Sequence, residues 1–464
     1  MEARPLKFIT EACGGKIVAG DAGRLVQRVC TDSRQVQAGD LFIALAGERF
    51  DAHDFLPDVV KKAAAVLVRT GRAPADPQSC AVIEVADLRA ALGQIAAAYR
   101  RDFAFPFIAV GGSNGKTTTK ELIAAVLRQR LATVWSEASF NNDIGVPLTL
   151  LRVDASHQAA VLEAGTNHPG ELRPLLQMIQ PRFGVITNVG REHLEFFGDL
   201  AGVAQEEGAL AEALPADGTL VLNGDDAFAA RLAARSRARV VRVGFGEAND
   251  WRAAWARLSK DGATFRVTAP RPEFNGDYRV NLLGRHQVNN ALFALALGAE
   301  LGLTAAELQR GLAECKPAKM RLQLFEQGGV RVLDDAYNAN ADSVLAALQT
   351  LAELPCKGRT VAVLGDMAEL GAHTEAAHRE VGRRAAELGI GQLIAVGKQA
   401  RWTAEGARAA GLHRVLEFAD VESAAGAVKN FLKPGDLLLL KASRAARLER
   451  ITEQLRQLEP ALKN

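Results

Sequence analysis

The stretch FIAVGGSNGKTTTKEL, residues 107–122, combines three local patterns. Residues 107–110 are a short apolar run of the kind that forms a buried strand. Glycines at 111 and 112 end that run, and from Lys116 onward the apolar residues recur with helical spacing. A strand, a glycine-containing loop and a helix start, in this order, predict a phosphate-binding loop. In such a loop backbone N–H groups and the positive end of the helix face an anion.

The residue types at the end of this loop indicate a nucleotide. Lys116 supplies a full positive charge, and the hydroxyl of Thr117 can reach a magnesium ion. The usual spacing, Gly-x4-Gly-Lys, needs glycine at position 110, where this chain has Val110, so a shorter form stands here. A glycine turn that binds nothing is the alternative. A lysine and three threonines at a helix start are hard to explain by packing, so we expect a bound nucleoside triphosphate.

Length and composition limit the class of protein. At 464 residues the chain is long enough for about two to four domains. It has 48% hydrophobic residues and a net charge of +2, which gives no general attraction to nucleic acid or membranes. No apolar run is long enough for a signal peptide or a membrane span. The five cysteines have neither metal-ligand nor disulfide spacing, so we expect a cytoplasmic protein.

The apolar runs divide the chain into three α/β units, which we place at residues 1–102, 103–315 and 316–464. In the second unit strands alternate with helices, which predicts a parallel sheet whose ligands lie beyond the carboxyl ends of its strands. Short strands without helices around residues 251–280 predict an antiparallel extension. The third unit has a doubly wound, Rossmann-like pattern without a dinucleotide-binding glycine motif.

Polar residues follow predicted strands of the second unit. Glu163 ends one apolar run, and carboxylate oxygens are ligands that Mg²⁺ prefers. His193 follows another run, within the polar sequence NVGREHLE. Because carboxyl ends of parallel strands meet at one edge, one crevice can contain Lys116, Glu163 and His193. A loop histidine is also common as a structural residue. Asn141 and Asn142 can orient a carboxylate or a phosphate, and an Asx turn is the alternative there.

The third unit has polar clusters at three predicted strand ends, namely DDAYNAN at 334–340, GDMAELG at 365–371, and Ser443 with Arg444. Ordinary loop chemistry explains each cluster alone about as well, but three on one sheet indicate a face directed at a ligand. In the first unit, TDSR at 31–34 has the residue types that hold a diphosphate, since arginine makes forked bonds to phosphate. A solvated loop explains that sequence equally well.

Together these motifs resemble the Mur ligases, the ATP-dependent amino-acid and peptide ligases of peptidoglycan synthesis. The shortened loop fits, since this family's form is Gly-x-x-Gly-Lys-Thr. The resemblance covers nearly the whole chain and is carried by TDSR (31–34), GDLF (39–42), GGSNGKTTTKE (111–121), FNNDIGVPLTLL (140–151), EAGTNHPGEL (163–172), NVGREHLEFFG (188–198), GRHQVNNAL (284–292), DDAYNAN (334–340), VLGDMAELG (363–371) and KASR (441–444).

The resemblance implies an α/β protein of three domains. These are a small N-terminal domain that binds a UDP-sugar peptide, a central P-loop ATPase domain with a parallel sheet, and a C-terminal Rossmann-like domain that closes on ATP. The DDAYNAN and GDMAELG loops are similar to those of members that join D-alanyl-D-alanine to UDP-N-acetylmuramoyl-tripeptide. The implied activity is an ATP-dependent carboxylate–amine ligation through an acyl phosphate, with Mg²⁺. We expect a monomer with no nucleic-acid partner and no membrane span.

The resemblance also implies roles for single residues. Those expected to act in catalysis are Lys116, Glu163, His193 and Arg321. Those expected to bind ATP are Gly112, Ser113, Asn114, Gly115, Lys116, Thr117, Thr118, Asn290 (adenine), Asp335 (ribose) and Arg321 (γ-phosphate). Those expected to bind Mg²⁺ are Thr117, Glu163 and His193. Those expected to face the UDP substrate are Ser33, Arg34, Asp40, Phe42, Asn142 and Thr166. Those expected near the dipeptide are Asn338, Asn340, Asp366, Glu369 and Leu370.

Position 207 departs from the pattern of several family members. They carry a carbamylated lysine shortly after the motif that contains His193, where its anion supports a second Mg²⁺. Glu207 stands at that position here. We hypothesise that Glu207 supplies a built-in carboxylate in place of the carbamate, with Glu206 as the other candidate. A glutamate on a solvated helix face is the alternative.

Three other functions fit part of the pattern. A related ligase that adds diaminopimelate is expected to carry Asp-Asn-Pro-Arg in its third domain, and the sequence contains none; a lysine-adding relative is the companion possibility. A folylpolyglutamate synthase has the same architecture. A nucleotide-binding module without turnover is disfavoured, because Lys116, Glu163, His193 and Asp335 are all present.

Overall fold

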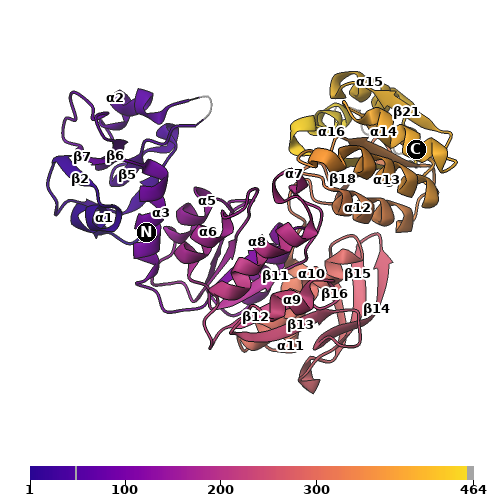
Figure 1. Ribbon diagram of the computed structural model, residues 1–464, viewed down its shortest axis with the longest axis horizontal. Helices are drawn as coiled ribbons and strands as arrows, with labels where there is room; N and C mark the ends of the chain where they lie inside the picture. The colour runs from indigo at the N-terminus through magenta and orange to yellow at the C-terminus, as the bar shows by residue number, and fades with distance from the viewer. Residues whose placement is uncertain (48–49, 457–464) are drawn as a thin grey trace.

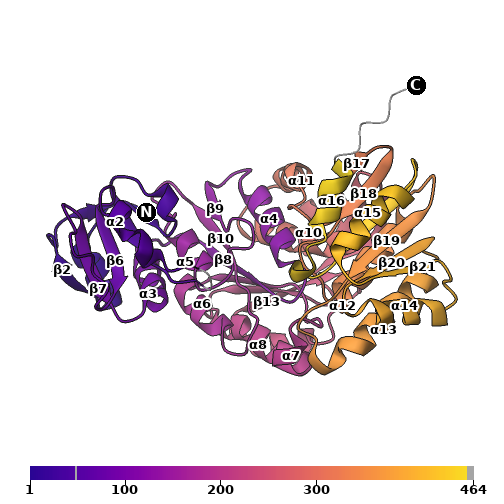
Figure 2. The same ribbon diagram turned by 90° about the horizontal axis from the view of Figure 1, so that it is seen from above.

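The computed structural model describes residues 1–47 and 50–456, which form three α/β units arranged in a row (Figures 1 and 2). The indigo N-terminal unit lies at one end and the orange to yellow C-terminal unit at the other, with the central unit between them. Each unit contains its own main sheet, and these sheets span residues 16–85, 107–280 and 323–441. The predicted three-unit α/β fold is confirmed.

The N-terminal unit is built on a five-stranded sheet of order β2-β7-β6-β5-β4. All neighbours run parallel except β2, which pairs antiparallel with β7. Two further short strands, β1 (Arg4–Pro5) and β3 (Leu25–Val26), pair with each other. The elements of the unit are β2 (Lys16–Ala19), β4 (Arg28–Cys30), β5 (Asp40–Ile43), β6 (Ala65–Arg69) and β7 (Ala81–Val85), with α1 (Leu6–Cys13), α2 (Leu56–Val59) and α3 (Leu88–Arg100).

The central unit has a nine-stranded sheet of order β16-β15-β14-β13-β12-β11-β8-β10-β9. Its strands are parallel from β9 to β14, and the predicted antiparallel extension is the β14–β16 ladder. The strands are β8 (Phe107–Gly111), β9 (Thr133–Trp135), β10 (Ala159–Glu163), β11 (Phe183–Ile186), β12 (Thr219–Asn223), β13 (Arg239–Gly244), β14 (Trp251–Ser259), β15 (Gly262–Thr268) and β16 (Gly276–Val280). The helices are α4 (Lys116–Leu127), α5 (Gly145–Leu150), α6 (Leu172–Ile179), α7 (Leu194–Phe197), α8 (Leu200–Ala213), α9 (Ala229–Ala233), α10 (His286–Glu300) and α11 (Ala305–Glu314).

Strand β8 explains why the central sheet is covered on both faces. Phe107 and Ala109 lie in one hydrophobic core, whereas Ile108 and Val110 lie in another, and all four side chains are fully buried. Successive side chains of a strand point to opposite faces, so an unbroken apolar run needs cover on both. Residues of α3, α5, α6 and α8 supply the first core, and residues of α4, α10 and α11 supply the second.

The first of these cores continues into the N-terminal unit through α3. Leu92 and Ile95 of α3 share one cluster with Leu41 and Leu67 of the N-terminal sheet and with Phe107 of the central sheet. α3 also packs against α5 and α6 of the central unit. The N-terminal and central units are therefore joined by a continuous hydrophobic core.

The C-terminal unit has a six-stranded sheet of order β17-β18-β22-β19-β20-β21, parallel apart from the β17–β18 pair. The strand–helix alternation expected there is confirmed. Strand β17 was not predicted, because its sequence, QLFEQ, has neither an unbroken apolar run nor a regular alternation, and none of its residues is fully buried. The elements are β17 (Gln323–Gln327), β18 (Val330–Asp334), β19 (Thr360–Gly365), β20 (Gln392–Val396), β21 (Val415–Phe418) and β22 (Leu437–Lys441), with α12 (Ala341–Glu353), α13 (Thr374–Glu387), α14 (Ala400–Ala409), α15 (Val421–Phe431) and α16 (Glu449–Arg456).

Residues 190–198, which we call the docking segment, connect the central and C-terminal units through polar contacts. The Arg191 guanidinium donates to Asp342 of α12 (2.8 Å) and to Glu380 of α13 (2.5 Å). The Glu195 N–H donates to the carbonyl of Glu369 (3.0 Å). Both views place α7, which lies in this segment, beside the C-terminal unit (Figures 1 and 2). This interface is thus largely polar, unlike the apolar one through α3.

Across the part of the chain that the structure describes, no helix combines the length and the apolar character needed to cross a membrane.

Helix α11 packs closely on α4, the helix that begins at the phosphate loop, and Gly311 lies at the point of contact. A Cβ at position 311 would collide with the Val126 Cα and lie 2.9 Å from the Ala125 carbonyl oxygen, both backbone atoms of α4. We expect Gly311→Ala to lower the free energy of unfolding by about 1–3 kcal/mol. Denaturant unfolding measures the change.

Gly426→Ala in α15 is the matched control, because a Cβ there would meet nothing within 4 Å. Since alanine favours a helix, this control should raise the free energy of unfolding by about 0.5–1 kcal/mol. Equal changes in the two variants would contradict the close approach of α11 to α4.

Candidate functional site

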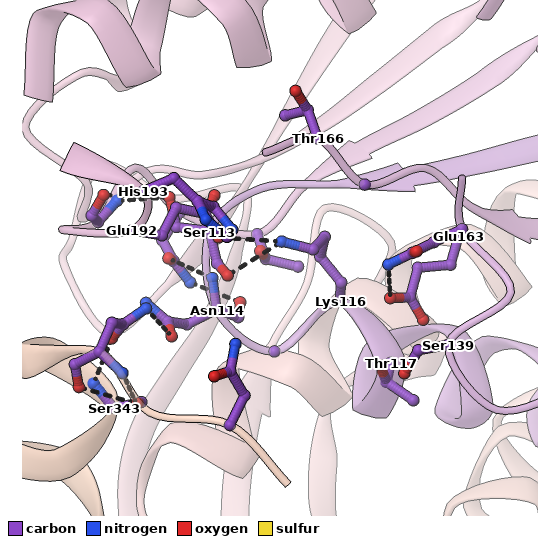
Figure 3. A pocket seen from close by; sticks show the side chains of 18 of the residues that line it. Ser113, Asn114, Lys116, Thr117, Ser139, Glu163, Thr166, Glu192, His193 and Ser343 are labelled. Carbon is purple, nitrogen blue, oxygen red and sulfur yellow. Dashed lines mark hydrogen bonds and ion pairs between the residues drawn. The ribbon is translucent and has the colours of Figure 1, made fainter. Parts of the chain in front are cut away.

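A cleft of about 1140 Å³ lies where the carboxyl ends of β8, β10 and β11 face the C-terminal unit. Lys116, Glu163 and His193, which we expect in one crevice from the sequence, all line it (Figure 3). The C-terminal unit contributes residues that follow β18, β19 and β22. The residues of predicted function that line the cleft are Ser113, Asn114, Gly115, Lys116, Thr117, Thr118, Asn142, Glu163, Thr166, His193, Asn290, Arg321, Asp335, Asn338, Asn340 and Glu369.

Two glycines allow the phosphate loop to take its shape. Gly112 has φ +106°, and a Cβ there would collide with the Thr187 hydroxyl and lie 2.7 Å from its N–H nitrogen. Gly115 has φ +85°, and a Cβ there would lie 2.8 Å from Asn290 Oδ1. Positive φ and such close approach exclude any side chain. The loop therefore requires glycine at 112 and 115 and tolerates Val110, which is a core residue of β8.

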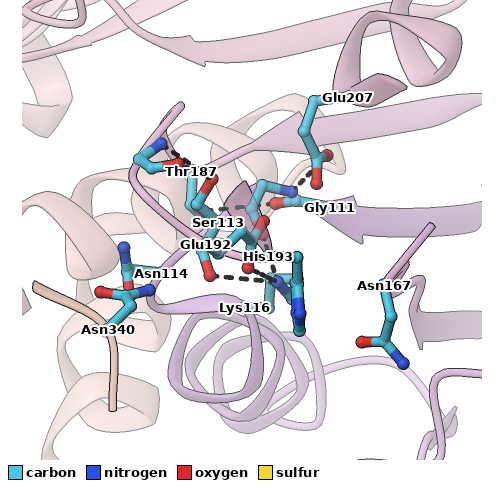
Figure 4. A network of polar contacts seen from close by, with 12 residues as sticks. Gly111, Ser113, Asn114, Lys116, Asn167, Thr187, Glu192, His193, Glu207 and Asn340 are labelled. Carbon is cyan, nitrogen blue, oxygen red and sulfur yellow. Dashed lines mark hydrogen bonds and ion pairs between the residues drawn. The ribbon is translucent and has the colours of Figure 1, made fainter. Parts of the chain in front are cut away.

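Hydrogen bonds join the loop to the residues after β11. Asn188 accepts the Ser113 N–H through its carbonyl (2.9 Å) and the Asn114 N–H through Oδ1 (3.0 Å). Its own amide donates to the Asn114 carbonyl (2.8 Å), and the Gly190 N–H donates to Ser113 Oγ (2.8 Å). From the C-terminal unit, Asn340 donates to Asn114 Oδ1 (2.9 Å). The loop thus has a defined shape that depends on both units (Figure 4).

Lys116 is the positive charge of the site. Its ammonium donates to the carbonyls of Gly112 (2.5 Å) and Ser113 (3.1 Å) and to the Glu192 carboxylate (3.2 Å). Burial opposes the charge, but the carboxylates of Glu192, Glu207 and Glu163 together raise the pKa of Lys116 above its usual value. Lys116 is therefore ionised, in surroundings with an excess of negative charge.

Glu163 and Thr117 present buried oxygen atoms that lack a partner. Glu163 Oε1 accepts from the Asn141 side chain (2.9 Å), whereas Oε2 is buried and unpartnered, as is Thr117 Oγ1. The loop that carries Asn141 is anchored by Lys120, a fully buried lysine whose ammonium donates to the Ser136 carbonyl (2.7 Å). Two unpartnered buried oxygens beside a phosphate loop form a donor set suited to a hard cation.

His193 lies at the start of α7 with φ +49°, a left-handed conformation that is uncommon for a residue with a side chain. Its Nδ1 contacts the carboxylate of Glu369, which itself has φ +59°. The contact joins the central unit to the C-terminal unit and fixes the orientation of the imidazole ring. Nε2 is the nitrogen left to face a ligand.

Glu207 lies on α8 and reaches the phosphate loop from behind rather than from the cleft (Figure 4). Its Oε2 accepts the Gly112 N–H (2.6 Å), and its Oε1 is buried without a partner. Burial raises the pKa of Glu207 to about 8, against the opposing effect of Lys116. Glu206 instead accepts the Gly170 and Leu172 N–H groups (2.8 Å each). The hydrogen bond that the Glu207 carboxyl group makes is therefore to the backbone of the phosphate loop.

Arg321 lies in the connection between α11 and β17, between two residues in left-handed conformation, Met320 (φ +59°) and Leu322 (φ +49°). Its guanidinium lies 4.4 Å from the centre of the Tyr337 ring. Asp335 Oδ1 accepts the Leu322 N–H (3.1 Å), and Lys441 donates to Oδ2 (2.6 Å). Asp335 thus supports the connection that presents Arg321 to the cleft.

Other predicted residues lie away from the cleft lining. The side chains of Asp40 and Phe42 are buried in the N-terminal unit, where Asp40 pairs with Arg28 (2.6 Å). Ser33, half-buried, and Arg34, exposed, lie in the 3₁₀ helix η1 (Ser33–Gln35) of that unit. The Asp366 carboxylate accepts the N–H groups of Lys398 and Gln399 (2.9 Å each), and Leu370 is buried. The side chains of Asp40, Phe42, Asp366 and Leu370 therefore support the fold, which sequence motifs alone did not indicate.

Several residues of the cleft lining were not predicted from the sequence, and three of them carry charges close to predicted site residues or to a unit boundary. Lys441 ends the apolar run of β22, so the signal that singled out Glu163 at the end of β10 was also available for it. Glu192 precedes His193, but nothing in the sequence indicates which of the two faces Lys116. Arg89 enters the cleft lining from the N-terminal unit without any local signal.

Sequence models of three protein-family domains match the chain one after another. The model described as "Mur ligase family, catalytic domain" matches residues 25–100, "Mur ligase middle domain" matches 110–298, and "Mur ligase, glutamate ligase domain" matches 320–444.

Two relatives are similar over nearly their whole lengths. The UDP-N-acetylmuramoyl-tripeptide–D-alanyl-D-alanine ligase of Escherichia coli (strain K12) is 38% identical over 460 residues, which cover 97% of this chain and 98% of the relative. The protein with the same name from Bacillus subtilis (strain 168) is 34% identical over 458 residues, which cover 98% of this chain and 99% of the relative.

Solved structures of Mur ligases are also similar to this chain over nearly its whole length. A crystal structure of MurF from Acinetobacter baumannii superimposes with a TM-score of 0.89 at 32% identity, covering 98% of this chain and all of the other (100%). The MurF ligase of Thermotoga maritima in complex with ADP gives a TM-score of 0.81 at 25% identity, over 93% of this chain and 97% of the other. With three domain matches in sequence and relatives matched from end to end, the chain belongs to the Mur ligase family.

Proposed function

We propose that this chain joins D-alanyl-D-alanine to UDP-N-acetylmuramoyl-tripeptide, with conversion of ATP to ADP and phosphate. The observation that carries the proposal is the cleft, in which a phosphate loop at the end of β8 faces the strand ends of the C-terminal sheet. Relatives that bear the name of this activity are similar over nearly the whole chain, which supports the choice of substrates.

The reaction needs the carboxylate to be activated, because a carboxylate is a poor electrophile towards an amine. A carboxylate oxygen of the tripeptide attacks the γ-phosphorus of ATP, the bond between that phosphorus and the ADP oxygen breaks, and an acyl phosphate forms. The dipeptide amine then attacks the acyl carbon. The tetrahedral adduct expels phosphate, the nitrogen loses a proton, and an amide remains.

Positive groups of the chain make this approach of anions feasible. Lys116 neutralises charge at the γ-phosphate, the N–H groups at the start of α4 face the phosphates, and Arg321 adds a second cation from the C-terminal side. Each positioned charge or hydrogen-bond donor of this kind typically contributes about 3 kcal/mol of transition-state stabilisation. We assign Asn290 to the adenine and Asp335 to the ribose, and the stacking of Arg321 on Tyr337 supports the position given to the guanidinium.

The residues present fit Mg²⁺. Thr117 Oγ1 and Glu163 Oε2 are oxygen donors with free coordination capacity, and Mg²⁺ is commonly held by one or two protein oxygens with phosphate oxygens and water. Within residues 1–47 and 50–456 no cluster of three His, Cys, Asp or Glu side chains is arranged to hold a metal alone, so phosphate oxygens and water would complete the shell. Bound there, Mg²⁺ would offset charge on the transferring phosphoryl group.

His193, and on our hypothesis Glu207, would serve a second Mg²⁺. The contact of His193 Nδ1 with Glu369 supports a fixed ring with Nε2 available. Glu207 has an unpartnered Oε1, but its raised pKa of about 8 means that it must lose a proton before it can act as a ligand. Its contact with Gly112 makes support of the loop its other role.

We assign the UDP substrate to residues 1–102, with Ser33, Arg34, Asn142 and Thr166 along its path. Because the side chains of Asp40 and Phe42 are buried, any contact that β5 makes with this substrate would come from its backbone. We assign the dipeptide to the C-terminal unit, residues 316–464, near Asn338, Asn340 and Glu369, and ATP to residues 103–315. The five cysteines are unpaired, which suits a reducing cytoplasm. A monomer remains our expectation.

Phosphate release tests the activity. With ATP and Mg²⁺, we expect release only when both UDP-N-acetylmuramoyl-tripeptide and D-alanyl-D-alanine are present, because each substrate contributes one reacting group. Reactions that omit either substrate are the controls. Release with diaminopimelate and a UDP-dipeptide, or with a folate and glutamate, but not with the dipeptide, would overturn the proposal.

Glu163→Gln tests the metal assignment. Loss of the charge should lower kcat about 100-fold or more and raise the Mg²⁺ concentration needed for half-maximal rate. Glu137→Gln is the control, since Glu137 is close in sequence to the anchored loop but is exposed and pairs with Arg152. A Glu163→Gln enzyme with the Mg²⁺ dependence of the wild type would speak against the assignment.

Glu207→Gln tests the buried carboxyl group. From about pH 5 to 8 the unfolded chain ionises Glu207 while the folded chain keeps its proton, so the free energy of unfolding falls as the pH rises. Glu207→Gln has no carboxyl group at this position, so its free energy of unfolding does not fall for this reason. Its stability relative to the wild type should therefore increase across that range by a few kcal/mol at most, since each pH unit contributes no more than about 1.4 kcal/mol. Urea unfolding at about pH 5.5 and about pH 8.5 measures the difference.

Glu212→Gln, on the same helix, is the control for this measurement. Arg235 and Arg173 lower the pKa of Glu212, which is the opposite direction, so its replacement should show no such gain. If the difference in free energy of unfolding between Glu207→Gln and the wild type does not change with pH, the pKa of Glu207 is not raised.

A further inference from the structure

The Lys116 ammonium has no hydrogen-bond donor left for a phosphate. An ammonium has three N–H donors, and here they meet the carbonyls of Gly112 and Ser113 and the carboxylate of Glu192. Both carbonyls belong to the loop itself, three and four residues before Lys116. For Lys116 to contact a phosphate, one of these partners must leave, and Glu192 is the partner from a separate segment.

Glu192 has the properties of a group that can be displaced. Its side chain is 8% exposed, only Oε2 is engaged, and Oε1 is buried without a partner. Because one carboxylate oxygen has no partner and the other has a single ion pair, few polar contacts oppose the displacement of Glu192. Figure 4 shows Glu192 facing Lys116 next to His193.

The residues on either side of Glu192 are held by the C-terminal unit. Arg191 donates its backbone N–H to Asp342 (2.7 Å) and its guanidinium to Asp342 and Glu380, and His193 contacts Glu369. Glu192 therefore lies between two anchors on the other unit. Its position against Lys116 depends on how the docking segment, residues 190–198, sits on the C-terminal unit.

We propose that Glu192 is an internal substitute for the terminal phosphate of the nucleotide, and that phosphate binding at Lys116 displaces it and loosens the docking segment. The inference rests on the proposed function only in that Lys116 contacts a nucleotide phosphate. A carboxylate and a phosphate cannot share the ammonium without strong repulsion, and Glu163 already adds negative charge nearby. Linkage then makes nucleotide binding and docking of the segment oppose each other by equal amounts.

Nucleotide affinity measures the substitution directly. We expect Glu192→Gln to bind a non-hydrolysable ATP analogue about tenfold more tightly than the wild type in isothermal titration calorimetry, which corresponds to about 1.4 kcal/mol. Glu195→Gln is the matched control. It removes one negative charge from the same segment, but Glu195 is exposed and is not among the hydrogen-bond partners of Lys116, so the dissociation constant should stay unchanged.

Titrations with and without Mg²⁺ separate this role from metal binding. Tighter binding of Glu192→Gln under both conditions supports the proposal. Binding that is weaker than in the wild type only when Mg²⁺ is present would make Glu192 a metal ligand and overturn it. Equal dissociation constants for the wild type, Glu192→Gln and Glu195→Gln would also overturn it, while leaving the proposed function intact. A wild-type protein that binds no nucleotide would instead refute the proposed function, and the inference with it.

A double-mutant cycle tests the link to the C-terminal unit. Arg191→Ala removes the guanidinium contacts to Asp342 and Glu380 and leaves the backbone N–H contact and the His193–Glu369 contact in place. It should tighten nucleotide binding of the wild type several-fold, because the docking segment then holds Glu192 less firmly. The same change in the Glu192→Gln background should have no further effect. An equal effect of Arg191→Ala in both backgrounds would show that the docking segment does not act through Glu192. Thermal unfolding of each variant confirms that the changes are made in folded protein.

Discussion

The arrangement of the site depends on one ammonium group facing three buried carboxyl groups. Lys116 stands at the start of α4, and Glu163, Glu192 and Glu207 approach it from the end of β10, from the loop after β11 and from α8. Each comes from a different element, so the sheet order that puts β8 between β10 and β11 is what assembles them. Glu163 and Glu192 together carry more negative charge than Lys116 offsets, which is unfavourable in a buried site unless further cations compensate it.

The two unit boundaries differ in their chemistry, and this difference suits their roles. A continuous apolar core through α3 holds the N-terminal unit on the central unit, and close-packed side chains resist relative movement. The boundary with the C-terminal unit near the cleft is made by ion pairs and single hydrogen bonds, such as Arg191 with Glu380 and Asn340 with Asn114. Such polar contacts are exchanged for contacts to a ligand more readily than close-packed apolar ones.

Local sequence patterns predicted what local physics determines. Apolar runs such as residues 107–110 and 159–162 must be buried on both faces, and the glycines of the phosphate loop are required by positive φ, so strands and loop were recognisable. Partners distant in the chain were not. Nothing near Asp335 indicates Lys441, nothing near Lys116 indicates Glu192, and the buried roles of Asp40 and Asp366 follow from contacts with Arg28 and with the N–H groups of Lys398 and Gln399.

The backbone around Arg321 restricts the rotamers of its side chain already in the folded protein. Met320 and Leu322, both in left-handed conformation, place their side chains in the two cores of the C-terminal unit, and Arg321 projects from between them onto Tyr337. An arginine that is immobilised loses about 2 kcal/mol of rotamer freedom. Here that entropy is lost when the C-terminal unit folds, so it is not lost again at each turnover. On the proposed role of Arg321 at the γ-phosphate, its guanidinium is preorganised, and the binding energy of the nucleotide remains available for catalysis.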